Sequence, residues 1–108
     1  MKSRTCRLSD RAARSLAEIS VWTYATFGER QADKYGDQLL QQVSAIAGGR
    51  TFSRSCRDVF APDLRSDLRF ARSGRHFIIF TETPDEILII DFIHQSADIG
   101  GRLEGLKA

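Results

Sequence analysis

The chain is predicted to be a single α+β domain in which an antiparallel sheet packs against an antiparallel hairpin of two helices. Three observations predict this class. In the first half, apolar residues recur at intervals of three and four, as on one face of a helix. In the second half they alternate or run without interruption, as in strands. The length of 108 residues suits one domain, which we expect to span residues 1–108.

Residues 4–8 (RTCRL) are expected to form a short first strand. A helix should begin directly after it, because Ser9 can cap the first turn and Asp10 suits the positive N-terminal end. Gly28 is the expected stop of this helix. One helix face is defined by apolar residues that recur three or four apart: Ala12, Leu16, Ile19, Trp22 and Ala25.

The second helix has the clearest periodicity of the chain. Gly48 and Gly49 are expected to end it. Because very few residues join the two helices, they should lie antiparallel as a hairpin. The apolar face of the second helix consists of Ala32, Tyr35, Leu39, Val43 and Ile46.

Three aromatic residues gather at the end of the first helix: Trp22, Tyr24 and Phe27. We expect one or two of them to pack in the core. The apolar face is already occupied by Leu16, Ile19 and Trp22, so Tyr24 points elsewhere. Tyr24 is therefore a candidate for a contact with a partner protein.

The segment 50–63 is polar, rich in arginine and contains a proline, which predicts a loop. A short strand follows, with Leu68 and Phe70 on one side and Arg69 and Ala71 on the other. A turn at Ser73-Gly74 should connect it to the next strand.

The last two strands are predicted by the runs RHFIIF and ILIIDFIH, with a turn between them at residues 83–86. The second run is almost continuously apolar, which is typical of a central strand covered on both faces. The predicted order is therefore β-α-α-β-β-β. Two helices can cover only one face of the sheet, so the other face is left for solvent or a partner.

The composition is that of an ordinary folded chain, with 42% hydrophobic and 28% charged residues and a net charge of +2. No apolar run is long enough to cross a bilayer, and no secretory signal is visible, so we expect a cytoplasmic protein with no membrane contact. Cys6 and Cys56 are expected to be free thiols. With no glycine-rich phosphate loop and no metal-spaced cluster, we expect no cofactor and no metal.

Positive charge is concentrated in residues 50–76, which carry seven arginines and three aspartates. A basic segment indicates an acidic partner, either a nucleic acid or an acidic protein. A solvated charged surface explains the same pattern equally well.

The segment His94-Gln95-Ser96-Ala97-Asp98 contains the residue types of a hydrolytic triad. On an extended strand, however, residues on the same side lie about 6–7 Å apart, too far for a nucleophile and its base. We therefore expect a structural role. Ser96 or Asp98 should satisfy backbone N–H groups where the strand ends, and His94 should lie at the sheet edge with one ring nitrogen satisfied.

Four stretches in this order resemble the ParE toxins: LSDRAARSLAEI, FGERQADKY, LRSDLRFARSGRHFIIF and ILIIDFIHQSAD. These toxins form one branch of the RelE/ParE superfamily of bacterial type II toxin–antitoxin systems. The resemblance implies a toxin that forms a hetero-oligomer with a ParD-like antitoxin and contacts DNA only through it. It also implies inhibition of DNA gyrase by protein–protein contact, without enzymatic activity. Relatives on the RelE branch cut mRNA, so an mRNA endonuclease is the alternative, as is a degenerate toxin that only binds its antitoxin.

Candidate antitoxin contacts are Tyr24 and a strip of arginines in or beside the second predicted strand, Arg65, Arg69, Arg72 and Arg75. Solvated charge on an edge strand is the alternative for this strip.

Candidate target contacts lie in the glycine-rich tail, residues 99–108, which we expect to be mobile. The resemblance implies that the C-terminal end touches the target, here through Arg102, Leu103, Leu106 and Lys107. Under the endonuclease alternative, the plausible catalytic set is Arg75, His76, His94 and Arg102. No tyrosine lies beyond Tyr35, which weakens the comparison with RelE enzymes that use a late aromatic residue.

Overall fold

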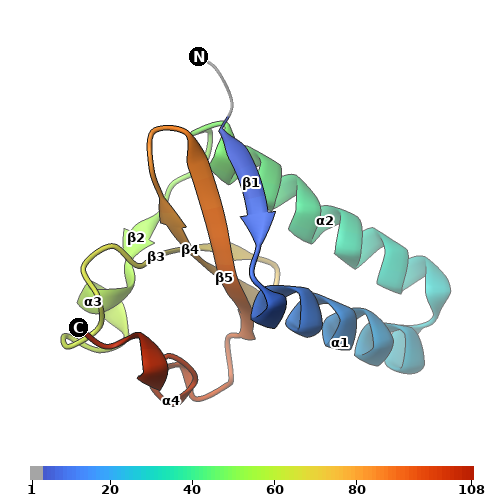
Figure 1. Cartoon of the computed structure of the whole chain (residues 1–108). Helices are drawn as coiled ribbons and strands as arrows, with labels where there is room; N and C mark the ends of the chain where they lie inside the picture. Colours follow the sequence, from blue (N-terminus) through green and yellow to red (C-terminus); the bar gives the residue numbers. More distant parts are fainter. Residues whose placement is uncertain (1–3) are drawn as a thin grey trace.

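A computed structural model of the chain describes residues 4–108 and contains one five-stranded sheet with helices on both faces (Figure 1). The strand order across the sheet is β1-β5-β4-β3-β2. The elements are β1 (Thr5–Leu8), α1 (Asp10–Phe27), α2 (Glu29–Ala47), β2 (Arg54–Ser55), α3 (Cys56–Val59), β3 (Arg69–Ser73), β4 (His76–Glu82), β5 (Glu86–His94), α4 (Ile99–Arg102) and a 3₁₀ turn, η1 (Glu104–Leu106).

The predicted α+β class and the β-α-α-β-β-β order are confirmed. The short elements β2, α3, α4 and η1 are additions to that order, and β2 and α3 lie in the segment that we expected to be a loop. Strands β2 to β5 pair antiparallel, whereas β1 runs parallel to β5. Parallel pairing requires a long connection between the two strands, and the chain between β1 and β5 is long enough to provide one.

The helical hairpin forms for the local reasons that the sequence indicates. The Ser9 hydroxyl accepts the Ala12 backbone N–H at 3.0 Å and caps α1. Gly28 lies between α1 and α2 with φ of 92°, a conformation that favours glycine, and its N–H donates to the Tyr24 carbonyl. The two helices therefore reverse direction within one residue.

The first core lies between the hairpin and the sheet. The periodic face of α2 supplies Leu39, Val43 and Ile46, of which Leu39 is fully buried. The sheet contributes the side chains Ala71, Ile78, Phe80, Ile87, Ile89 and Phe92. The expected division of β3 is also observed, because Ala71 belongs to this core while Leu68 and Phe70 belong to the opposite face.

The other face of the sheet is covered by the chain itself, so our expectation of an open face was wrong. Side chains from residues 56–68 and from the C-terminal segment pack on this face to form a second core. It consists of Cys56, Leu64, Leu68, Phe70, Ile79, Ile93, Ile99 and Leu103. The sequence pattern did not reveal this layer because its apolar residues come from short segments without helical or strand periodicity.

The C-terminal tail that we expected to be mobile is packed in the structure. Ile99 and Leu103 are buried, and the Arg65 N–H donates to the Leu106 carbonyl at 3.1 Å. The Ala108 N–H donates to the Asp63 carbonyl at 2.8 Å. Glycines are frequent in this segment, but the apolar residues Ile99 and Leu103 pack in the core on this face of the sheet.

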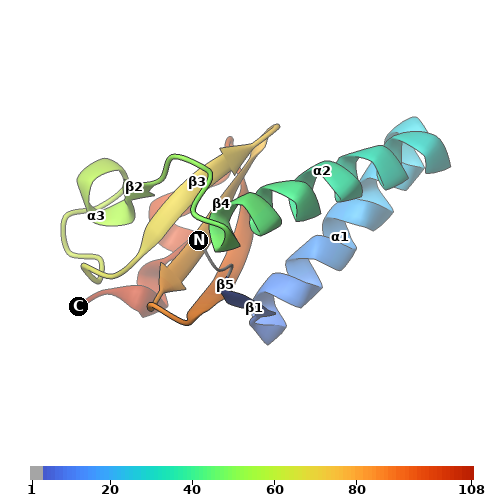
Figure 2. The same cartoon turned by 90° about the horizontal axis from the view of Figure 1, so that it is seen from above.

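The far half of the helical hairpin projects beyond the sheet (Figures 1 and 2). Trp22, Tyr24 and Phe27 lie on this projecting part and are 60–63% exposed. The expected core packing of one or two of these residues was therefore wrong. An apolar helix face becomes buried only where a second layer reaches it, and here the sheet ends first.

Candidate binding cleft

A cleft of about 670 Å³ lies between the projecting hairpin and the end of the sheet. Its floor and rim come from α1, α2, the β3–β4 turn, the end of β5 and α4. The lining residues are Ser15, Glu18, Ile19, Trp22, Thr23, Phe27, Gln31, Tyr35, Gly74, Arg75, His76, Phe92, His94 and Arg102. The volume falls within the range of small-molecule sites in proteins.

The proposed endonuclease residues Arg75, His76, His94 and Arg102 all line this cleft, so the fold brings the four together. Tyr35 from α2 joins them. Its position far upstream in the sequence hid this relationship, because only the folded hairpin places α2 beside the β3–β4 turn.

Tyr35, which is half-buried, and the buried His76 form the polar centre of the cleft. The Tyr35 hydroxyl lies 2.6 Å from His76 Nδ1 and accepts the Arg75 backbone N–H at 3.1 Å. Burial raises the pKa of Tyr35 and, together with the neighbouring His94, lowers the pKa of His76 to about 4. His76 is therefore neutral at pH 7.

His94 stands opposite His76 in the β4–β5 pairing, and the two rings meet edge to face with centroids 5.1 Å apart. The Ser96 N–H donates to His94 Nδ1 at 3.0 Å, and Ser96 Oγ lies 2.7 Å from the same nitrogen. Asp98 instead caps α4 by accepting the Gly101 N–H. The geometry is that of a local turn rather than a triad, as the sequence led us to expect.

Asp91 on β5 is a fully buried carboxylate that the sequence reasoning missed. It accepts the Ser15 hydroxyl at 2.5 Å and lies 2.8 Å from Arg11 Nε and 3.5 Å from Arg102 Nη2. Arg11 also donates to the Arg102 carbonyl. The sequence signal that could have revealed it is its position as the one acidic residue within the apolar run ILIIDFIH. Asp91 joins β5, α1 and α4 beside the cleft.

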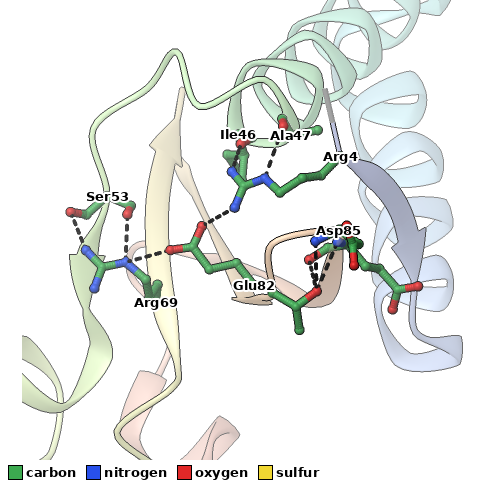
Figure 3. Close-up of polar contacts among 9 residues, drawn as sticks. Arg4, Ile46, Ala47, Ser53, Arg69, Glu82 and Asp85 are labelled. Atoms are coloured by element: carbon green, nitrogen blue, oxygen red, sulfur yellow. Dashed lines mark hydrogen bonds and ion pairs between the residues drawn. The ribbon is translucent and has the colours of Figure 1, made fainter. Parts of the chain in front are cut away.

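The predicted arginine strip is not one surface. Arg69 lies on the helix-facing side of β3, where its guanidinium binds Ser53 and lies 3.9 Å from Glu82 (Figure 3). Glu82 also pairs with Arg4, which caps the end of α2 at the carbonyls of residues 46 and 47. This network leaves little of Arg69 for a partner.

The other three arginines of the predicted strip lie apart from Arg69. Arg65 pairs with Asp67 at the surface. Arg72 leaves the opposite face of β3 and donates to the Gln95 side chain at 2.6 Å. Arg75 alone lines the cleft.

The four predicted target contacts differ in their accessibility. Leu103 is fully buried and cannot touch a partner in this conformation. Lys107 is held between Asp63 and Glu104 at 3.2 and 3.1 Å. The Arg102 side chain is about half exposed while paired with Asp91, and Leu106 is partly buried.

The two cysteines and the acidic side chains of residues 4–108 do not form a further site. Cys6 and Cys56 are free, as expected, and burial raises the pKa of Cys56 to about 12. No cluster of three or more His, Cys, Asp or Glu side chains in this part of the chain has the arrangement of a metal site. None of the helices described here is both long enough and apolar enough to cross a membrane.

The fold of this chain also occurs in a solved toxin–antitoxin system. A solved structure described as a chromosomal ParDE toxin–antitoxin system from P. aeruginosa is similar, with a TM-score of 0.67 and 17% sequence identity over 85% of this chain and 96% of the other. The profile of the family "ParE toxin of type II toxin-antitoxin system, parDE" matches residues 6–99. This chain belongs to that family. No curated protein gives a significant match.

Proposed function

We propose that this chain inhibits DNA gyrase by protein–protein contact and is neutralised by a ParD-like antitoxin made with it. The family match over residues 6–99 carries this proposal, since it assigns the chain to the ParE toxins. A toxin of this kind would act in the cytoplasm, where its target works. It would exist as a hetero-oligomer with the antitoxin until released.

The protonation of the cleft supports a non-enzymatic mode of action. Cleavage of RNA requires a base to take the 2′-hydroxyl proton and an acid to protonate the leaving oxygen. His76 has a pKa of about 4, so its ring is neutral at pH 7 and is poorly suited to act as the general acid. His94 Nδ1 already accepts a backbone N–H, so this nitrogen has no free lone pair to act as a base.

The antitoxin surface is proposed to include Tyr24. Val21 and Tyr24 lie on the side of α1 that faces away from the cleft, and both are exposed at 70% and 60%. A tyrosine supplies a large contact area with one polar tip, which makes it a frequent anchor at interfaces. Arg72 and Arg65 are the remaining charged candidates for this interface, because Arg69 is engaged within the chain.

The target surface is proposed to include the accessible parts of Arg102, Leu106 and Lys107 in the C-terminal segment. Leu103 supports this surface from beneath because it is fully buried. Contacts to gyrase would then be made by a packed segment, which loses less conformational entropy on binding than a mobile tail.

A RelE-like mRNA endonuclease is the second candidate, favoured by one observation. Arg75, His76, His94 and Arg102 converge on a single cleft together with Tyr35. Under this alternative, Arg75 would stabilise the phosphate and His94 would transfer the proton after a change of tautomer.

The proposal is tested with purified protein in a gyrase supercoiling assay, run beside an mRNA cleavage assay with and without ribosomes. We expect supercoiling to be inhibited and the inhibition to be relieved by the short protein encoded in the adjacent reading frame. Cleaved mRNA together with unaffected supercoiling would favour the endonuclease.

A further inference from the structure

The hydrogen bonds of the two cleft histidines determine which ring nitrogen carries a proton. At His94, Nδ1 accepts the Ser96 N–H at 3.0 Å, so the proton is on Nε2. At His76, Nδ1 lies 2.6 Å from the Tyr35 hydroxyl, whose other acceptor, the Ser73 carbonyl, is 3.4 Å away. We assign the tyrosine proton to the shorter contact, which places the proton of His76 on Nε2. Each ring therefore retains one N–H donor for a ligand.

Two guanidinium groups line the same cleft. Within residues 4–108, no hydrogen bond or ion pair engages the Arg75 guanidinium; only its backbone N–H and carbonyl are bonded. Arg102 pairs with Asp91, but Arg11 pairs with the same carboxylate, so the three groups together remain positive. Glu18 is the one carboxylate among the lining residues and comes from α1. Donors thus dominate the polar end of the cleft.

The opposite wall of the cleft is aromatic. Trp22 and Phe27 meet edge to face with centroids 5.9 Å apart, and both side chains are more than 60% exposed. Aromatic faces next to a positively charged groove favour the stacking of a nucleic acid base. Gln31 supplies an amide on the same wall, which can both donate to and accept from the edge of a base.

We propose that this cleft binds a nucleotide, with the phosphate at Arg75 and the two histidine Nε2–H groups and the base against Trp22 and Phe27. The volume of about 670 Å³ suits one nucleotide better than a peptide, which would need a groove along the whole hairpin. Arg75 supplies the planar donor pair that recognises phosphate oxygens. The proposed site is independent of gyrase inhibition and requires no bond cleavage.

The test uses the full chain and the fluorescence of Trp22, its one tryptophan. Adenosine monophosphate, inorganic phosphate, adenosine and N-acetylglutamate are titrated separately. We expect a saturable change with adenosine monophosphate, and binding at least about tenfold weaker for the other three, since each lacks the phosphate, the base or both. NMR should show the Nε2 signals of His76 and His94 shifting with the same midpoint.

Arg75→Ala should weaken binding of adenosine monophosphate by about tenfold or more, because a charged donor is lost from the phosphate. The matched control is Arg65→Ala, which removes an exposed arginine outside the cleft and should leave the titration unchanged. Circular dichroism checks that both variants fold. The proposal is overturned if adenosine monophosphate gives no saturable change, or if Arg75→Ala binds it as well as the original chain does. Adenosine or phosphate binding as tightly as the nucleotide would also overturn it. Tighter binding of N-acetylglutamate would assign the cleft to protein carboxylates instead.

Discussion

Asp91 Oδ2 lies 2.8 Å from Arg11 Nε, so a fully buried carboxylate of β5 is paired with a guanidinium at the start of α1. The Ser15 hydroxyl binds the other carboxylate oxygen at 2.5 Å. Arg102 reaches the same group from α4 at 3.5 Å. A buried charge is tolerated only where hydrogen bonds and opposite charges surround it, and here these partners come from two helices, α1 and α4.

Asp91→Ala should destabilise the fold by about 3–5 kcal/mol, because it leaves Arg11, Arg102 and Ser15 without their buried acceptor. Urea unfolding followed by circular dichroism measures the loss. Asp67→Ala is the matched control, since Asp67 is in an exposed pair with Arg65 and should cost at most about 1 kcal/mol. An equal effect of the two substitutions would show that the Asp91 contacts do not support the fold.

Leu39→Ala should cost about 2–5 kcal/mol through lost burial and a cavity, because Leu39 is fully buried in the core under the hairpin. The next residue offers the control: Leu40 is 49% exposed, and Leu40→Ala should cost less than about 1 kcal/mol. Denaturant unfolding of both variants and of the original chain gives the midpoints to be compared. If the midpoint of Leu39→Ala matched that of the original chain, the α2 face would have been assigned wrongly.

The stability of the fold should fall as the pH is lowered from about 6.5 to about 4. His76 has a pKa of about 4 in the folded chain, below its ordinary value of 6.5. Between these values the unfolded chain holds a proton that the folded chain lacks, so acid favours unfolding. We expect a contribution of about 2 kcal/mol, discounted because the ring borders an open cleft.

Unfolding free energies measured at several pH values, for the original chain and for His76→Gln, isolate this contribution from that of the carboxylates. The variant should lose part of the slope between pH 4 and 6.5. Identical slopes in both chains would mean that His76 titrates in the fold as it does in water.

Tyr24→Ala should weaken antitoxin binding by about tenfold or more, because an exposed aromatic anchor is lost from the outer side of α1. Tyr24→Phe retains the apolar area and should retain most of the affinity. Surface plasmon resonance with the immobilised antitoxin gives both dissociation constants. Unchanged binding of Tyr24→Ala would remove the outer side of α1 from the antitoxin interface.

The elements that the sequence predicted well are those with local signals. The Ser9 cap, the reversal at Gly28 and the periodic face of α2 depend on residues that are close in the chain. Their physical causes, which are capping, backbone conformation and amphipathicity, can be seen without a tertiary structure.

The features that the sequence could not predict depend on distant segments. Leu64 and Leu103 meet on the second face of the sheet although neither lies in a periodic pattern. A truncation after Asp98 would therefore expose a core and would not remove a target contact alone. The exposure of Trp22 was missed because nothing local reveals where the sheet ends.

In the candidate cleft, too, some features could be predicted from the sequence, and others depend on tertiary packing. Four of its polar residues, Arg75, His76, His94 and Arg102, are predicted as a set, because the chain has only two histidines that could transfer protons. The participation of Tyr35 and the burial that lowers the pKa of His76 arise from tertiary packing. The predicted arginine strip does not form one surface, because neighbouring strand residues leave opposite faces and Arg69 finds partners within the chain.

The stoichiometry of gyrase inhibition tests the central claim, that this toxin acts by contact, most directly. Purified protein is titrated into supercoiling reactions at several gyrase concentrations, beside the double variant His76→Gln with His94→Gln. If contact is the mechanism, the amount of toxin that gives half inhibition rises in proportion to gyrase, and the folded double variant inhibits to a similar extent. Inhibition by toxin far below the concentration of gyrase, lost in the folded double variant, would contradict the account and show that the cleft performs catalysis.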